Sequence, residues 1–258
     1  MDTTSQEFVF SVINRENPES VDYQIAWYIL EHVDELGNIT LGELASRCSV
    51  SKSTVSRFCR HAGLEDFMEL QHSVRHSRMN PQRKFWFNAP EPTVEGFLPV
   101  FANTLMQMHN SIDWKLLHKI VDDIAAFPKV SVFGRMQSGD TACELQHNLY
   151  ICGKLIQSTN IPDYQVEFIN NASSEDLIIV FSSRGRFFDY ILRNCPRLLD
   201  GSNLPRIYFI TSTHIHPVPK FIHRVVEVSR SLEFDKANIL ASTYAQLIAI
   251  DYCNRYCK

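Results

Sequence analysis

Residues 40–63 read TLGELASRCSVSKSTVSRFCRHAG, a pattern that predicts two short helices joined by a tight turn. Thr40 and Glu43 have the spacing of a capping box, in which each side chain bonds the backbone amide of the other residue. Apolar residues then recur at helical spacing, Ser51 is a suitable N-cap for the second helix, and Gly63 is a suitable stop. In that helix Val55, Phe58, Cys59 and Ala62 share one side. The stretch therefore has the form of a helix-turn-helix.

Helical spacing continues on both sides of this stretch. Upstream, apolar residues predict one supporting helix that begins near Ser20 and ends at Gly37. Downstream, Leu64, Phe67 and Leu70 predict a further helix. The N-terminal part of the chain is thus expected to be all helical.

Charge distinguishes a DNA-reading element from an ordinary helical hairpin with a solvated polar face, which has the same periodicity. The chain is acidic overall, with a net charge of −4. Residues 1–40 hold one Arg against eight acids, whereas residues 41–84 hold eight Lys or Arg against four acids. A local positive excess in an acidic chain fits a surface that faces phosphates. Ser51, Lys52 and Ser53 at a helix N-terminus suit phosphate contact, and Arg57 suits bidentate contact with guanine.

The run from Val50 to Arg60, followed by Gly63 and Phe67, resembles the N-terminal domain of RpiR/MurR-type regulators, which are bacterial transcription factors that respond to phosphosugars. The resemblance covers about residues 5–80 and implies that Ser51, Ser53, Thr54 and Arg57 contact DNA. With the other outward polar residues, the predicted DNA-binding set is Ser51, Lys52, Ser53, Thr54, Ser56, Arg57 and Arg60.

Length and proline spacing predict two domains. A DNA-binding domain over residues 1–80 leaves enough of the 258 residues for a second core. Prolines at positions 81, 90, 92 and 99 are too many for a continuous helix, so the boundary is expected between Ser77 and Pro99. We expect a linker and connecting helix over residues 81–112 and a second domain over residues 113–258. Helices are predicted at about Phe97–Ser111 and Asp113–Ala126.

From Lys129 onward strand and helix patterns alternate, which predicts a parallel sheet with helices packed on its faces. The predicted strands are residues 129–133, 176–181, 206–210 and 224–228. Ser138 is expected to cap the helix that follows the first strand, a later helix is expected to run through Ile191 and Leu198, and a long helix is expected from Ala237 to Cys253. Ligands of open α/β sheets bind beyond the carboxyl ends of strands, where this chain has hydroxyls and glycines suited to a phosphate.

Residues 115–255 resemble a sugar isomerase (SIS) domain, a doubly wound fold that binds phosphosugars. The resemblance depends on the turn from Gly134 to Ser138, the loop from Ser182 to Gly185 and the Ile-Thr-Ser sequence at 210–212. It implies that strand-end hydroxyls and amides hold a phosphate. The predicted ligand-binding set is Ser138, Ser182, Ser183, Arg184, Gly185, Arg186 and Thr211. The expected fold class is α/β, with an all-α helix-turn-helix domain followed by a doubly wound parallel-sheet SIS-like domain.

This domain departs from the SIS pattern at the loops. SIS domains commonly have a Ser-x-Ser-Gly-x-Thr loop, but Arg184 and Phe187 stand where hydroxyl donors are expected. Met136 stands where the first turn often has a second glycine. Two interpretations stay open. Either Arg184 or Arg186 binds a different anion through charge-assisted bonds, or the domain has lost its ligand and mainly dimerises.

We predict that the protein is not an enzyme and holds no cofactor or metal. An isomerase needs a carboxylate or imidazole beside the substrate carbonyl, and the candidates qualify by type alone. These candidates are Glu144, His147, His214, His216 and Glu233. Cys253 and Cys257 lie one helical turn apart, but the sequence offers no convincing third ligand.

The remaining composition predicts a cytoplasmic protein without membrane contact. Seven cysteines without a CxxC pair favour reduced thiols, and no apolar run reaches the ~20 residues that cross a bilayer. We expect a homodimer or higher homo-oligomer that binds a double-stranded DNA operator and senses a phosphosugar or related anion. The alternatives are a SIS-type phosphosugar isomerase or lyase, a regulator whose SIS domain only dimerises, and a structural protein that binds partners.

Overall fold

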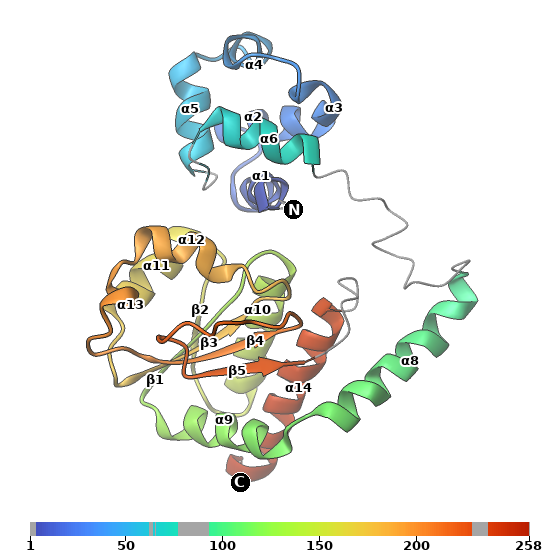
Figure 1. The fold of residues 1–258 in the computed structure, drawn as a ribbon, viewed down its shortest axis with the longest axis vertical. Helices are drawn as coiled ribbons and strands as arrows, with labels where there is room; N and C mark the ends of the chain where they lie inside the picture. The colour runs from blue at the N-terminus through green and yellow to red at the C-terminus, as the bar shows by residue number, and fades with distance from the viewer. Residues whose placement is uncertain (1–3, 62–63, 65, 77–92, 229–236, 258) are drawn as a thin grey trace. The chain divides into compact units, whose positions relative to one another are not determined.

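A computed structural model describes residues 4–61, 64, 66–76, 93–228 and 237–257 (Figure 1). The chain divides into two compact units, residues 1–80 and residues 81–258. The predicted helix stop at Gly63 and the acid candidate Glu233 lie outside the described residues. Among the helices that are described, none has both the length and the apolar character needed to span a bilayer.

The first unit is built of helices. Its elements are α1 (Thr4–Arg15), α2 (Val21–Glu31), α3 (Val33–Leu36), α4 (Leu41–Arg47), α5 (Lys52–His61) and α6 (Phe67–His76). The fully buried side chains of Ile29, Leu44, Phe58 and Leu70 come from four of these helices and form the centre of the unit. The all-helical prediction, with its paired helices after Thr40, is confirmed.

The prediction of one helix from Ser20 to Gly37 is wrong. Ser20 does cap the start of α2, because its hydroxyl accepts from the amide of Tyr23 at 3.1 Å. The helix ends at His32, whose φ of −113° and ψ of 31° are not helical, and α3 then begins. This break redirects the chain and leaves Leu36 fully buried, an outcome of tertiary packing that helical spacing alone does not reveal.

The second unit begins with α8 (Val94–Ser111) and α9 (Trp114–Ala126), which start at the hydroxyl cap of Thr93 and the carboxylate cap of Asp113. Pro99 lies inside α8, so the helix predicted from about Phe97 begins three residues earlier. A proline removes one backbone hydrogen bond, and α8 continues past it.

Five strands form one parallel sheet. They are β1 (Lys129–Phe133), β2 (Gln157–Ser158), β3 (Asp176–Phe181), β4 (Arg206–Thr211) and β5 (Arg224–Glu227). Their order is β2-β1-β3-β4-β5, and every neighbouring pair is parallel. The predicted parallel α/β fold is therefore confirmed. The order reverses direction between β1 and β3, and open α/β sheets bind ligands beyond the strand ends at such a switch point.

Helices cover both faces of the sheet (Figure 1). One core joins the sheet to α9, α10 (Gln137–Ile151) and α14 (Ala237–Tyr256). The other joins it to α11 (Pro162–Asn171), α12 (Phe187–Asn194) and α13 (Arg197–Asp200). Along β3, Ile179 belongs to the first core and Ile178 to the second, as the alternation of a strand requires. The expected helix through Leu198 is instead two helices, because Pro196 interrupts it.

A buried ionic cluster links α9 to β4. The carboxylate of Asp123, only 3% exposed, accepts from Tyr208 Oη at 2.6 Å. Arg206 approaches the same carboxylate to 3.0 Å, and Lys119 also donates to it. Burial of Asp123 opposes ionisation, but these three donors outweigh it and lower the pKa of Asp123. The cluster is therefore held together by a charged carboxylate.

Candidate functional site

The start of α4 and the start of α5 are both fixed by side-chain caps. Thr40 donates its amide to Glu43 Oε2 at 2.6 Å, and Glu43 donates its amide to Thr40 Oγ1 at 3.2 Å. Ser51 Oγ accepts from the amide of Thr54 at 3.1 Å. The predicted capping box and the predicted N-cap are therefore confirmed.

The turn between these helices closes through backbone bonds. Ser49 has a φ of 55°, a left-handed conformation that ends α4. The amide of Ser49 donates to the carbonyl of Ser46 at 3.1 Å, and that of Val50 donates to the carbonyl of Ala45 at 2.8 Å. This is the Schellman pattern, and it sets the direction in which α5 leaves the turn.

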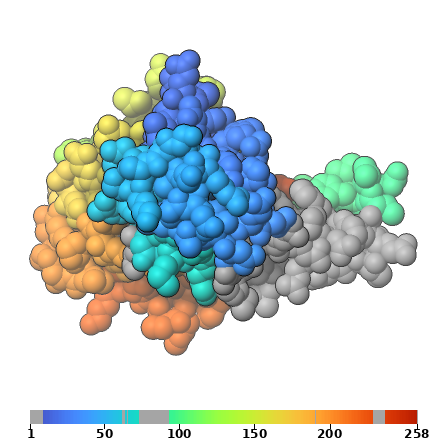
Figure 2. Space-filling view, turned by 90° about the horizontal axis from the view of Figure 1, so that it is seen from above, coloured from blue at the N-terminus to red at the C-terminus, as the bar shows by residue number. Residues whose placement is uncertain are grey.

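Helix α5 has one buried side and one side that faces solvent. Val55 and Phe58 are fully buried against the rest of the unit. All seven predicted DNA-contacting residues are exposed or half-buried, and Figure 2 looks onto the light-blue surface of α4 and α5. The exposed ones are Ser51, Lys52, Ser53, Arg57 and Arg60, and the half-buried ones are Thr54 and Ser56.

Hydroxyls and a cation gather at the N-terminal end of α5. Ser51 Oγ lies 2.7 Å from Ser53 Oγ and 2.8 Å from Thr54 Oγ1. The side chain of Lys52 crosses Gly42 of α4, because a Cβ built on Gly42 would lie 2.9 Å from Lys52 Cε. Hydroxyls and a positive charge at a helix N-terminus form a surface that suits a phosphate group.

The second candidate site lies where β1 and β3 end, as the strand order predicts. Ser183, after β3, has its Oγ 3.1 Å from Ser138 Oγ of α10 and donates to Asn238 Oδ1 of α14. Asn238 in turn donates to Gln137 Oε1. We call Gln137, Ser138, Ser183 and Asn238 the strand-end network. It joins two helices and one loop in a chain of polar contacts.

The other predicted ligand residues lie close to this network but have different partners. Ser182 and Thr211 are buried, and their hydroxyls accept from the amides of Phe187 and Thr213, each at 3.1 Å. They therefore shape their own loops. Arg186, the N-cap residue of α12, has its Nε 3.0 Å from Asp189 Oδ2. Gly185 has a φ of 73°, a conformation that favours glycine, and Arg184 precedes it.

The turn after β1 brings α10 very close to the strand. A Cβ on Gly134 would lie 2.2 Å from the carbonyl oxygen of Ser138, so only glycine fits this position. Ser138 is the second residue of α10 and makes no cap, so the predicted capping role is wrong. The N-cap position belongs to Met136, whose φ of 53° and ψ of −131° are strained for a residue with a side chain.

Among the described acid and base candidates, Glu144 holds two helices together and the three histidines are exposed. Glu144 accepts from Ser242 Oγ at 2.7 Å and from Gln246, which ties α10 to α14. His214 Nδ1 lies 2.7 Å from Glu227 Oε1, and His147 is exposed on α10. The contacts of Glu144 give it a structural role, whereas His214 is exposed.

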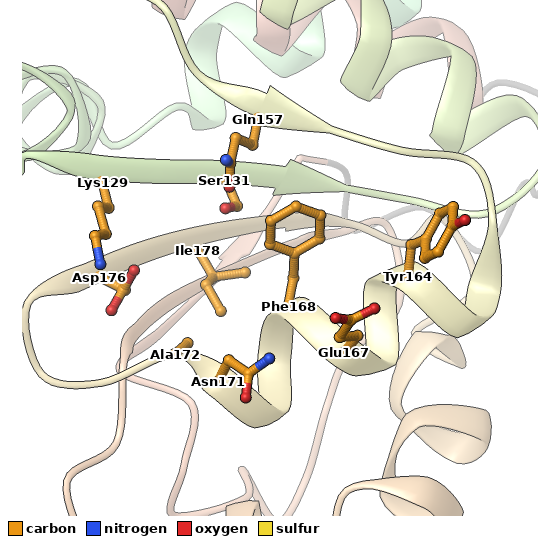
Figure 3. A pocket seen from close by; sticks show the side chains of 10 residues that line it. All are labelled: Lys129, Ser131, Gln157, Tyr164, Glu167, Phe168, Asn171, Ala172, Asp176 and Ile178. Carbon is orange, nitrogen blue, oxygen red and sulfur yellow. The ribbon is translucent and has the colours of Figure 1, made fainter.

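A cavity of about 520 Å³ lies between α11 and the face of the sheet formed by β1 and β3 (Figure 3). Lys129 and Asp176, the first residues of β1 and β3, line it together with Tyr164 and Phe168 of α11. It is therefore separate from the strand-end network, which lies beyond the last residues of the same strands.

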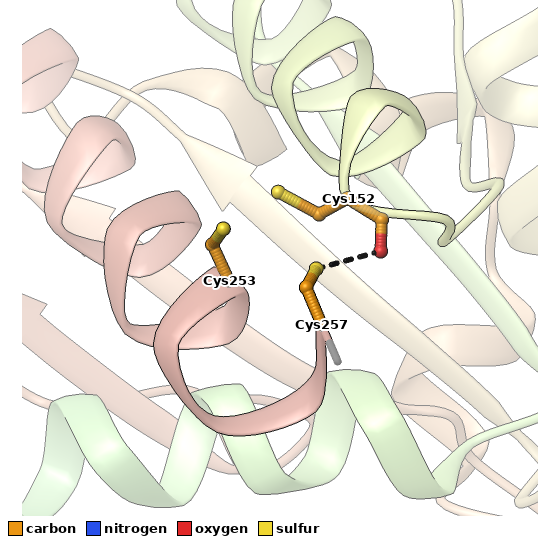
Figure 4. Close-up of side chains that lie close together, drawn as sticks. All are labelled: Cys152, Cys253 and Cys257. Atoms are coloured by element: carbon orange, nitrogen blue, oxygen red, sulfur yellow. Dashed lines mark hydrogen bonds between the residues drawn. The ribbon is translucent and has the colours of Figure 1, made fainter.

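Sequence reasoning missed two members of the strand-end network, Gln137 and Asn238. The signal available for Asn238 was an amide side chain in the first turn of the last helix. It also missed that a third cysteine, Cys152, lies beside Cys253 and Cys257 (Figure 4). Cys152 and Cys257 are 105 positions apart in the sequence, so their spacing could not predict that they lie side by side.

Comparison with known proteins supports both units. Residues 15–80 match the helix-turn-helix domain of the rpiR family. The HTH-type transcriptional regulator HexR of Pseudomonas aeruginosa is 24% identical over 171 residues, which are 63% of this chain and 59% of HexR. An uncharacterised HTH-type transcriptional regulator of Caldanaerobacter subterraneus is 30% identical over 124 residues, 46% of this chain and 44% of that protein. This chain thus spans about half the length of these relatives.

Among solved structures, a Bacteroides fragilis protein assigned as a phosphosugar isomerase involved in capsule formation superposes with a TM-score of 0.50 at 12% identity. The match covers 63% of this chain and 90% of that protein, and it supports the fold of the second unit. Residues 15–80 therefore match a helix-turn-helix domain of the rpiR family, and the second unit, which follows it, has a fold similar to that of the Bacteroides fragilis protein.

Proposed function

We propose that this protein is a bacterial transcriptional regulator that reads double-stranded DNA with α5. The observation that carries the proposal is the exposed polar side of α5 in a domain of the rpiR family. Ser51 and Lys52 at its N-terminal end contact phosphates and fix the register of the protein on the duplex. Arg57, one turn further along, reaches a guanine edge in the major groove.

The regulator acts as a homodimer or higher homo-oligomer. Two copies of α5 then meet two half-sites of a roughly palindromic operator, since two-fold protein symmetry is mirrored in the DNA. HexR, the relative in Pseudomonas aeruginosa, is named as a transcriptional regulator, which agrees with this role.

The test is recovery of bound genomic fragments, followed by titration of one recovered fragment with wild-type and variant protein. Arg57→Ala is expected to weaken specific binding by about 1–3 kcal/mol, because a lost bidentate base contact costs that amount. Arg193→Ala is the matched control, since it removes the same charge from an exposed position on α12. Equal affinities of the Arg57 variant and the control for the fragment would exclude α5 as the reading element.

The second unit senses an anionic effector of the phosphosugar class at the strand-end network. Ser138, Ser183 and Asn238 come together at the switch point of the sheet. Their polar groups already bond one another, so a phosphate oxygen exchanges these bonds for its own. Effector binding would shift the operator affinity by about 1–3 kcal/mol if ordinary allosteric coupling applies.

The same self-bonded network favours a second candidate role, in which this unit only holds the oligomer together. A panel of phosphosugars and inorganic phosphate separates the two roles through thermal shifts and operator titrations. An effector raises the melting temperature of wild type and not of Ser183→Ala, while the control Ser202→Ala, at an exposed position before β4, responds like wild type. No response to any member of the panel would leave the assembly role.

Catalysis forms no part of the proposed function. The contacts that tie Glu144 of α10 to α14 support a protein without isomerase activity. Incubation of purified protein with the same panel tests this, since any turnover of a phosphosugar contradicts it.

A further inference from the structure

Three cysteines meet where two parallel helices of the second unit end (Figure 4). Cys152 is the C-cap residue of α10, Cys253 lies in the last turn of α14, and Cys257 directly follows that helix. Their three sulfur atoms all lie within 4.8 Å of one another. The thiol of Cys257 also donates to the backbone carbonyl of Cys152 at 3.0 Å. None of these residues belongs to the strand-end network or to α5.

The distances fit a shared metal ion after a small adjustment. Zn–S bonds are about 2.3 Å long, so three thiolates on one tetrahedral ion stand roughly 3.8 Å apart. The sulfur atoms therefore need to approach by about 1 Å at most. Cys253 and Cys257 are four positions apart and share one side of a helical turn, which permits this movement. Cys253 is exposed, so an ion can enter from solvent.

The surrounding backbone favours a cation. α10 and α14 both present their C-terminal ends here, and the free carbonyls of a helix C-terminus carry partial negative charge. Thiolate ligands are soft and select Zn²⁺ and Cu⁺ over hard ions such as Mg²⁺. A disulfide would use two of these thiols and leave the third without a role. A zinc site with three protein ligands and one open position uses all three.

We propose that Cys152, Cys253 and Cys257 form a three-thiolate site for one thiophilic d¹⁰ cation, with Zn²⁺ as the expected ion and water as the fourth ligand. The ion joins the end of α14 to the end of α10. It adds to the polar contacts that already connect these helices at Glu144 and at Asn238.

The test uses full-length protein, reduced and freed of metal, titrated with Cd²⁺ as a spectroscopic probe. Wild type is expected to bind one equivalent with a sulfur-to-cadmium charge-transfer band, and Zn²⁺ is expected to displace it. Removing a group that only supports a metal ligand weakens metal binding by up to about 100-fold. Cys152→Ser and Cys257→Ser each remove a ligand itself, so they are expected to weaken Cd²⁺ binding by more than about 100-fold. Cys143→Ser is the matched control, since it removes a half-buried thiol from the same helix α10.

A second measurement separates metal binding from loss of structure. Cys253→Ser changes an exposed position, so its circular dichroism is expected to match wild type while the Cd²⁺ band is lost. Zn²⁺ is expected to raise the melting temperature of wild type and of Cys143→Ser. It is not expected to raise that of Cys152→Ser, Cys253→Ser or Cys257→Ser. A Cd²⁺ affinity equal to that of wild type in any of the three variants Cys152→Ser, Cys253→Ser and Cys257→Ser would overturn the proposal. So would a disulfide among the three cysteines that forms in air in the purified chain and excludes Cd²⁺.

Discussion

The substitution Gly134→Ala tests whether the turn after β1 holds the strand-end network in place. The new Cβ would lie 2.2 Å from the carbonyl oxygen of Ser138 and 2.7 Å from the amide nitrogen of Gly139. β1 is paired with β2 on one side and β3 on the other, so the strand cannot move away from the new Cβ. The first turn of α10 must therefore move by about 1 Å to bring the Cβ and the Ser138 carbonyl oxygen to an ordinary contact distance. Such a movement lengthens the 3.1 Å contact between Ser138 Oγ and Ser183 Oγ beyond hydrogen-bond range.

The expected cost follows from these two effects. Overpacking at a tight contact costs about 1–3 kcal/mol, and the lost hydroxyl contact adds about 1 kcal/mol. Urea unfolding of the full chain, followed by circular dichroism, measures the sum. Gly153→Ala is the matched control, because Gly153 has a φ of 82° with nothing within 4 Å of its Cβ, so it introduces backbone strain without a clash. A loss no larger than that of the control would refute the reasoning and remove the support for a site built on α10.

Three further perturbations follow from contacts described above. Thr40→Ala removes the hydroxyl that accepts from the amide of Glu43 and should lower the free energy of unfolding of the first unit by about 1 kcal/mol, and an unchanged urea midpoint would contradict this. Asp123→Asn should destabilise the second unit by about 1–3 kcal/mol at pH 7. Because folding lowers the pKa of Asp123, its stabilisation is present above the unfolded pKa of about 3.9 and is lost as pH falls through the folded pKa. A difference in unfolding free energy between wild type and variant that does not change with pH would contradict this prediction. Met136→Gly should raise the free energy of unfolding by about 1 kcal/mol by relieving a positive φ, and urea unfolding that shows no gain would mean that the turn is not strained.

Local signals in the sequence were sufficient for the main elements. The capping box at Thr40 and the cap at Ser51 act within four residues, so their sequence pattern and their geometry agree. The strands β1, β3 and β4 are apolar runs long enough to be recognised without their neighbours. β2 is only two residues long, and it exists because β1 offers it an edge.

The candidate sites were harder to predict because they are made by tertiary contacts. The residue types at Ser138 and Ser183 suggested phosphate binding, but the contact between their hydroxyls depends on β1 and β3 being neighbours. Asn238 joins them because α14 packs beside α10. No pattern within either helix predicts that the two helices are neighbours. The cation-rich side of α5 was predictable, since a single helix carries it.

The strand-end network also has a consequence for the order in which the newly made chain becomes competent. α4 and α5 are complete once residue 61 has left the ribosome, whereas the contact of Gln137 with Asn238 spans 101 positions and closes only after residue 238 has been made. A message cut short before codon 238 therefore encodes α4 and α5 without the residue that completes the strand-end network.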